Sequence, residues 1–260
     1  MQSVRAASLP VAIPATIALA WCIAIAAQIT GSAVLLHHDR LIERGPAGGI
    51  ALALFVLAWL VMIAAMMLPS SLPFMRMFAF ASSNQPRPAA MLFAFFSAYV
   101  IVWLVFGIAA FAGDLVVHRI VDRTAWLGAH PWIISGAVLA GAGAFQFSSL
   151  KDACLRACRL PSNFLVRYYR RGAGAAFAMG YRHGLYCVGC CWALMLVTFA
   201  AGFANLWWMA ALTALMVFEK TANRGRTAVP IAGAVLLTWS ALVLIHPAWL
   251  PAAFSGFSSG

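Results

Sequence analysis

Three cysteines fall within five residues near the start of a long apolar segment: Cys187, Cys190 and Cys191. On a helix, side chains four residues apart lie along one stripe, and Cys190 would flank the stripe that its neighbours share. That stripe holds His183, Cys187, Cys191 and Met195. Imidazole, thiolate and thioether together suit a soft metal ion, Cu(I) first, or Zn(II) if the thioether stays out. Membrane helices also carry cysteines as small packed residues, but this clustering favours a functional site.

A second pair, Cys154 and Cys158, is again four residues apart, which on a helix places both sulfurs on one side. Arg156 and Arg159 lie beside this pair, and we expect them to favour the thiolate form that binds metals or exchanges disulfides. Five of the six cysteines therefore lie in two tight clusters, which indicates metal or redox chemistry rather than a disulfide framework. The sixth, Cys22, is alone in the first apolar run, and we expect it to pack against neighbouring helices.

Three methionines lie close together at the end of the second apolar run. Met62 and Met66 are four residues apart and share a helix face, and Met67 lies beside them. Methionines on their own usually serve as adaptable packing. Beside the cysteine clusters they are candidates for weaker, exchangeable ligands of a soft metal ion.

Two polar residues complete the candidate site. Glu219 ends the sixth apolar run and is followed by Lys220, so local pairing of the two is the simple interpretation. An acidic side chain at the edge of an intramembrane segment is also a functional candidate. His183 follows Arg182, and we expect it at the membrane interface, neutral if it binds a metal.

The composition indicates an integral membrane protein. Of 260 residues, 64% are hydrophobic and only 9% are charged, which is too little charge for a soluble domain of this size. The sequence therefore predicts an all-α, polytopic transmembrane helical bundle. The net charge of +11 does not indicate nucleic-acid binding, because the basic residues lie in short loops between apolar runs. There they act as topology signals and contact anionic lipid headgroups.

We expect about seven spans in a single integral membrane domain, residues 1–260. Their approximate bounds are 9–36, 47–68, 89–112, 131–148, 184–203, 206–218 and 228–245. The first is too long for a signal-peptide core and is expected to be retained. The sixth is short, so six spans are the alternative if it re-enters the membrane. A strongly basic stretch, residues 150–175, is expected to form a cytoplasmic loop.

Most lysines and arginines fall on the side that holds the N-terminus, which predicts a cytoplasmic N-terminus and, with seven spans, an external C-terminus. This topology brings both cysteine clusters, the methionines, His183 and Glu219 to one depth on the cytoplasmic side. The sequence has neither a P-loop for ATP nor a covalent haem motif, and buried acids for a proton relay are nearly absent. A pump or hydrolase is therefore not expected, and a role other than catalysis is favoured.

Four blocks of sequence resemble a bacterial family of multi-span proteins of unknown function, described as predicted metal-binding integral membrane proteins. The blocks are the run from Trp59 to Pro69, the run from Lys151 to Pro161 with its two cysteines, the run from Gly184 to Met195, and Glu219-Lys220. The resemblance implies that these blocks belong to one site, and it implies a location in the bacterial inner membrane.

The leading hypothesis is a membrane protein that binds Cu(I) on its cytoplasmic side, in metal transport, delivery or homeostasis. Its core ligands would be Cys187, Cys190 and Cys191, completed by Cys154 and Cys158. Its partners would be the lipid bilayer, the metal ion and a metallochaperone or a metalloenzyme under assembly. Three alternatives stay open: a structural Zn(II) site, a thiol redox protein that exchanges electrons with quinone, and an assembly factor whose cysteines only pack.

Overall fold

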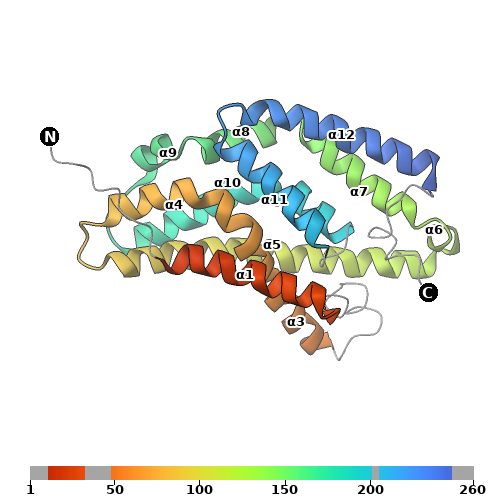
Figure 1. The fold of residues 1–260 in the computed structure, drawn as a ribbon, viewed down its shortest axis with the longest axis horizontal. Helices are drawn as coiled ribbons and strands as arrows, with labels where there is room; N and C mark the ends of the chain where they lie inside the picture. The colour runs from red at the N-terminus through yellow and green to blue at the C-terminus, as the bar shows by residue number, and fades with distance from the viewer. Residues whose placement is uncertain (1–10, 33–47, 201–204, 248–260) are drawn as a thin grey trace.

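The computed structural model describes residues 11–32, 48–200 and 205–247. Every regular element in these ranges is helical, which confirms the all-helical prediction. The elements are α1 (Ala12–Ile29), α3 (Gly48–Met62), η2 (Ile63–Met67), α4 (Leu68–Ser82), α5 (Pro88–Arg123), α6 (Ala125–Gly128), α7 (Trp132–Phe145), α8 (Ser149–Arg159), α9 (Pro161–Tyr168), α10 (Ala173–Ala200), α11 (Leu206–Thr221) and α12 (Gly225–Ile245). Figure 1 shows them as an elongated bundle, with α5 running along its length.

Helix α10 is the central element, and it packs most extensively against α5. Gly180 makes this close approach possible, because a β-carbon there would overlap with the backbone carbonyl of Phe95. α10 begins at Ala173, well before the start expected at residue 184. The first turns of α10 therefore lie along α5, and the cysteine run falls in its second half.

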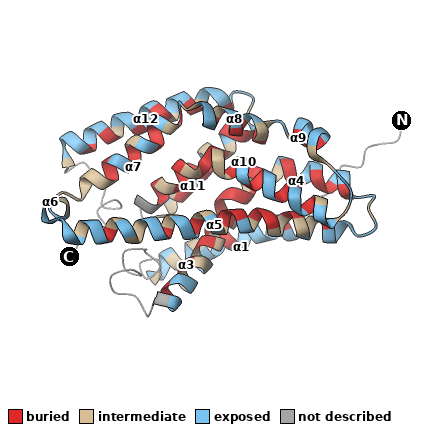
Figure 2. Ribbon diagram, turned by 180° about the vertical axis from the view of Figure 1, so that it is seen from behind, coloured by how far each residue is buried: buried red, intermediate tan, exposed pale blue. Residues whose placement is uncertain are grey.

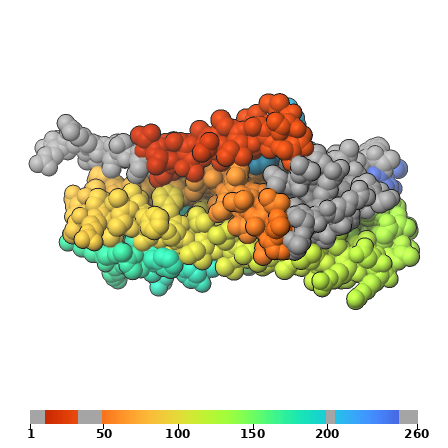
Figure 3. Space-filling view, turned by 90° about the horizontal axis from the view of Figure 1, so that it is seen from below, coloured from red at the N-terminus to blue at the C-terminus, as the bar shows by residue number. Residues whose placement is uncertain are grey.

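The second apolar run does not stop at Pro69 as expected. A π-helical turn, η2, joins α3 to α4, and the helical rod continues to Ser82. Pro69 has no N–H to donate to the carbonyl of Ala65, four residues before it. The indole nitrogen of Trp21 on α1 donates to that carbonyl instead, at 3.0 Å. The proline is tolerated because the wide turn and α1 together satisfy the backbone around it. Figure 3 shows α1 (red) running along the upper edge of this view, next to α3 (orange).

The basic stretch expected as a loop is helical. α7 ends at Phe145, and the chain bends by 63° into α8. Ser148 caps α8, because its side-chain oxygen accepts from the backbone N–H of Lys151 at 3.0 Å. Pro161 then opens α9 at a position where its missing N–H costs nothing. The site therefore receives a helix, α8, where the sequence predicted a basic loop.

Four helical segments in the described ranges are long and apolar enough to cross a bilayer: α1, residues 49–82, α5 and α12. Taking α7 and α8 together as one bent span makes five. This is fewer than the seven expected. Neither α10 nor α11 is among them, and α11 has only 16 residues. Residues 9, 36, 47 and 203, at which three expected spans begin or end, lie outside the described residues.

Buried residues lie on the inner faces of the helices, and residues on the outer faces are exposed along most of the helix length (Figure 2). Many of the exposed side chains are large and apolar, among them Ile101, Val105 and Ile108 on α5. The molecule therefore has an apolar exterior around a core that contains several polar and charged groups.

Candidate functional site

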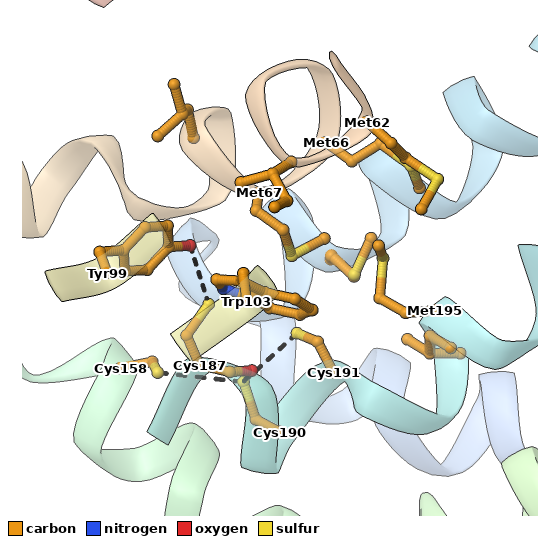
Figure 4. Close-up of a cluster of buried hydrophobic side chains, with 14 of the residues drawn as sticks. Met62, Met66, Met67, Tyr99, Trp103, Cys158, Cys187, Cys190, Cys191 and Met195 are labelled. Carbon is orange, nitrogen blue, oxygen red and sulfur yellow. Dashed lines mark hydrogen bonds between the residues drawn. The ribbon is translucent and has the colours of Figure 1, made fainter. Parts of the chain in front are cut away.

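Sulfurs from two helices meet in the core. The Sγ of Cys158 on α8 lies 3.9 Å from the Sγ of Cys190 on α10, and Cys190 lies 3.3 Å from Cys191. All three side chains are buried. Two sulfurs that bind one metal ion at about 2.3 Å each cannot be more than about 4.6 Å apart, and both pairs meet this limit. We call Cys158, Cys187, Cys190 and Cys191 the thiol cluster; Figure 4 shows it from one side.

Helix α8 is fixed in place by contacts to α11. Lys151 at its start donates to the Glu219 carboxylate at 2.7 Å. Arg159 at its end donates to the backbone carbonyls of Glu219 and Ala222, the second at 2.8 Å. These contacts at both ends turn the apolar side of α8 inward, so that Cys158 faces α10.

Cys154 also faces α10, at a position one turn from Cys158. A β-carbon at residue 189 would lie 2.6 Å from the Cys154 sulfur, so glycine at this position lets the two helices approach. Burial raises the pKa of the Cys154 thiol above its ordinary value. The expectation that Arg156 and Arg159 favour thiolate here is therefore wrong for Cys154. Arg156 pairs with Asp152 on the outer side of α8, and Arg159 reaches α11.

Cys187 has an environment unlike that of the other thiols. The Nζ of Lys220 and the hydroxyl of Tyr99 each lie 3.2 Å from its sulfur, and the hydroxyl of Ser71 lies 3.8 Å away. Lys220 also donates to Ser70 at 2.9 Å. Hydrogen bonds from charged or polar donors stabilise an anionic acceptor, so these groups would stabilise negative charge on the Cys187 sulfur.

The buried charges are not paired as the sequence suggested. Glu219 pairs with Lys151 rather than with the adjacent Lys220, and both partners are essentially inaccessible to solvent, at 1% and 0% exposure. One carboxylate oxygen of Glu219, Oε1, has no hydrogen-bond partner. Two lysines and one carboxylate therefore lie in the core beside the thiols. Sequence reasoning placed Lys151 and Lys220 in the blocks expected to form one site but gave neither a role, although any lysine at the edge of an apolar run is a functional candidate.

The four methionines are all buried: Met62, Met66, Met67 and Met195. The π turn changes the helical phase, so that adjacent Met66 and Met67 both point into the core. Figure 4 shows Met67 reaching toward the thiols and Trp103, with Met195 alongside and with Met62 and Met66 farther from the thiols in this view. Thr198 donates to the Met62 sulfur at 3.8 Å. The core thus holds thioethers next to thiols, as the spacing of the methionines suggested.

His183 is not interfacial as expected. It is 2% exposed and stacks on Phe74, with ring centroids 4.1 Å apart, and on Tyr99 at 5.6 Å. Neither of its ring nitrogens has a hydrogen-bond partner. His183 therefore shares the helix stripe with Cys187 but is enclosed by aromatic rings.

A preformed metal cage is absent from the described residues, because nowhere in them do three or more His, Cys, Asp or Glu side chains surround one point. The sulfurs lie in neighbouring pairs instead, Cys158 with Cys190 and Cys190 with Cys191. Soft thiolate and thioether donors select Cu(I) over the harder divalent ions, and Cu(I) is satisfied by few ligands. Thiolate and thioether donors of this kind are therefore compatible with copper.

Comparison with known proteins agrees with this chemistry. The copper chaperone family PpoB2 has a family model that matches residues 56–243, which include every member of the thiol cluster and all four methionines. Searches of curated proteins and of solved structures give no significant match. The match covers well over half of the chain, and the chain therefore belongs to the PpoB2 family of copper chaperones.

Proposed function

We propose that this chain is a multi-span protein of the bacterial inner membrane that binds Cu(I) through its thiol cluster on the cytoplasmic side. It then delivers the ion to a copper protein under assembly. The observation that carries the proposal is the 3.9 Å separation of Cys158 and Cys190, because two helices fixed by other contacts bring their sulfurs to one point. The copper chaperone family supports the choice of metal.

The apolar exterior supports the membrane location. Ile231 and Val235 on α12 and Val105 on α5 are each more than half exposed. Soluble monomers rarely expose apolar surface over such lengths of helix, whereas lipid covers it at no cost. The bias of basic residues supports a cytoplasmic N-terminus. In this arrangement α8 and α9 lie at the cytoplasmic face, and α10 and α11 complete a bundle of seven spans.

The proposed ligands fall into two groups. Cys158, Cys190 and Cys191 hold Cu(I), Cys187 lies within reach as a further thiolate, and Cys154 lies at the edge of the site. The second group is the methionines, whose neutral thioethers bind more weakly and make release possible: Met62, Met66, Met67 and Met195. His183 and Glu219 are outside the ligand set, because the histidine is enclosed by rings and the glutamate holds Lys151.

Titration of the metal-free, detergent-purified protein with Cu(I) against a chromophoric chelator tests this function. We expect stoichiometric binding that weakens as the pH falls, because protons compete with the metal for sulfur. The double variant Cys158→Ser/Cys190→Ser should lose at least tenfold in affinity. Cys22→Ser is the matched control, because Cys22 is exposed on α1, and it should bind as the unaltered protein does.

Two outcomes would support the alternatives instead. Stoichiometric Zn(II) in the purified protein together with weak Cu(I) binding would favour a structural zinc site. Quinone-linked oxidation of thiols that continues at full rate after chelators have removed all metal would favour a redox enzyme.

A further inference from the structure

Cys158 and Cys190 have a geometry that serves more than metal binding. Their sulfurs lie 3.9 Å apart on different helices, and the structure records both cysteines as free thiols. We propose that Cys158 and Cys190 form a reversible disulfide between α8 and α10, made by exchange with a small-molecule disulfide. Formation of this disulfide does not depend on the proposed copper function. Its effect on copper binding does rest on that proposed function.

Cys191 is excluded as a disulfide partner of Cys190 by backbone geometry. Cys190 and Cys191 are adjacent in one helix, and consecutive Cα atoms are about 3.8 Å apart. A disulfide needs Cα atoms about 4.4–6.8 Å apart, so this pair cannot close without breaking α10. Cys187 is held by Lys220 and Tyr99 on the other side of the cluster.

Exposure sets the order of the two exchange steps. Cys158 is 9% exposed on the surface helix α8, whereas Cys190 is 1% exposed. A small disulfide can therefore reach Cys158 first, and Cys190 acts as the resolving thiol from inside. Arg156 and Arg226 are exposed on the outer side of α8, where both pair with Asp152; the three groups together keep a net positive charge, which attracts an anionic disulfide such as oxidised glutathione to this helix.

The exchange balances without another reactant. The Cys158 sulfur bonds to one sulfur of the small disulfide, the bond between that disulfide's sulfurs breaks, and the first small thiol leaves with the Cys158 proton. The Cys190 sulfur then bonds to the Cys158 sulfur, the mixed disulfide breaks, and the second small thiol leaves with the Cys190 proton. The two protein thiols lose two electrons in all, and the small disulfide gains them.

The disulfide would also change the copper site. Both sulfurs would be bonded to each other rather than available as thiolates, and only thiolates bind the metal strongly. Oxidation would therefore release Cu(I) or prevent its capture, and a reductant would restore binding.

Mass mapping of the metal-free, full-length protein in detergent tests the disulfide directly. After incubation with oxidised glutathione and alkylation of free thiols, we expect one crosslink between the peptides that contain Cys158 and Cys190. Cys154 should stay alkylated, although it lies on the same helix with similar exposure. Cys154→Ser is the matched control and should give the same crosslink.

The single variants test the order of the steps. Cys190→Ser should trap one glutathione on Cys158, whereas Cys158→Ser should leave Cys190 alkylated. A Cys158 that stays free in the unaltered protein, a crosslink through Cys154, or glutathione on Cys190 in Cys158→Ser would overturn the proposal. The first two of these readouts use a protein in which Cys158 and Cys190 are intact, so misfolding of a variant does not affect them.

A copper titration separates this proposal from the proposed function. The oxidised protein should bind Cu(I) at least tenfold more weakly than the reduced protein and should recover with a reductant. If the crosslink forms and the affinity does not change, the disulfide stands and Cu(I) binding at this pair is wrong. If Cu(I) binding needs Cys158 and Cys190 but no crosslink forms, the copper function stands and the disulfide is wrong.

Discussion

The ammonium group of Lys220 lies 3.2 Å from the sulfur of Cys187, in a part of the core that solvent does not reach. This contact joins α11 to α10, and Tyr99 and Ser70 extend it to α5 and α4. A Cu(I) ion bound by two or more thiolates leaves a net negative charge. A buried ammonium beside that complex stabilises it, which makes Lys220 a candidate for tuning copper affinity.

We expect Lys220→Met to weaken Cu(I) binding roughly ten- to a hundredfold, the equivalent of a charged hydrogen bond of about 1.5–3 kcal/mol. Lys220→Arg keeps the charge and should recover part of the loss. Competitive titration against a chelator measures the affinity, and thermal unfolding of the metal-free protein shows whether the fold survives. Tighter binding by Lys220→Met would mean that the ammonium competes with copper for the sulfur.

Glu219→Gln should destabilise the protein by about 3–5 kcal/mol, because it leaves Lys151 charged and unpaired in the core. Replacing both partners, as Lys151→Met/Glu219→Leu, should restore most of the stability. The matched control is Asp152→Asn, whose ion pairs to Arg156 and Arg226 are exposed and are worth less than about 1 kcal/mol. Thermal unfolding in detergent compares the variants. Equal losses for Glu219→Gln and Asp152→Asn would contradict a structural role for the buried pair.

Gly189→Ala should push α8 away from α10, because the new β-carbon would lie 2.6 Å from the Cys154 sulfur. Cys158 moves with α8, so Cu(I) affinity should fall at least tenfold. Cys154→Ala removes the sulfur that the β-carbon would meet, so the double variant Gly189→Ala/Cys154→Ala should regain most of the affinity. A double variant no better than Gly189→Ala would show that the loss of affinity does not arise from the clash with Cys154.

Met66→Leu keeps the volume and apolarity of the side chain, so it should cost less than about 1.5 kcal/mol of stability. Capture of Cu(I) by the thiols should be unchanged, and transfer to an acceptor chelator should slow because one thioether is lost. Stopped-flow transfer kinetics measure this, with Met77→Leu on the exposed side of α4 as the control. A transfer rate equal to that of the control would show that Met66 takes no part in transfer of the ion.

Reporter fusions test the proposed topology. A fusion after Arg171 should report a cytoplasmic location, and a fusion after Gly260 should report an external one. Cytoplasmic signals from both would mean an even number of spans, with α11 as the segment that re-enters the membrane.

Local patterns in the sequence were sufficient for part of this site. The four-residue spacing of Cys154 and Cys158 puts both on the inner side of α8, because spacing alone determines which residues share a helix face. Apolar composition predicted the long apolar helices but neither the basic helices α8 and α9 nor the helix ends, since α5 and α10 extend well beyond their apolar runs.

The partners of the buried charges could not be predicted from sequence patterns. Lys151 and Glu219 are 68 residues apart, and their contact depends on the bend between α7 and α8. The direction in which Met66 and Met67 point depends on the π turn, which no local sequence pattern predicted. Each of these features arises from packing between distant segments, whereas spacing rules describe one helix at a time.

Gly180 has a mechanical consequence for the site. Because Gly180 brings the backbones of α10 and α5 into contact, these two helices form the fixed side of the site. Helix α8 forms the opposite side of the site: it packs against α10 and is joined to α11 by the side chains of Lys151 and Arg159. A movement of α8 that broke these contacts would carry Cys158 away from Cys190, while the other three clustered sulfurs, all on α10, stayed in place.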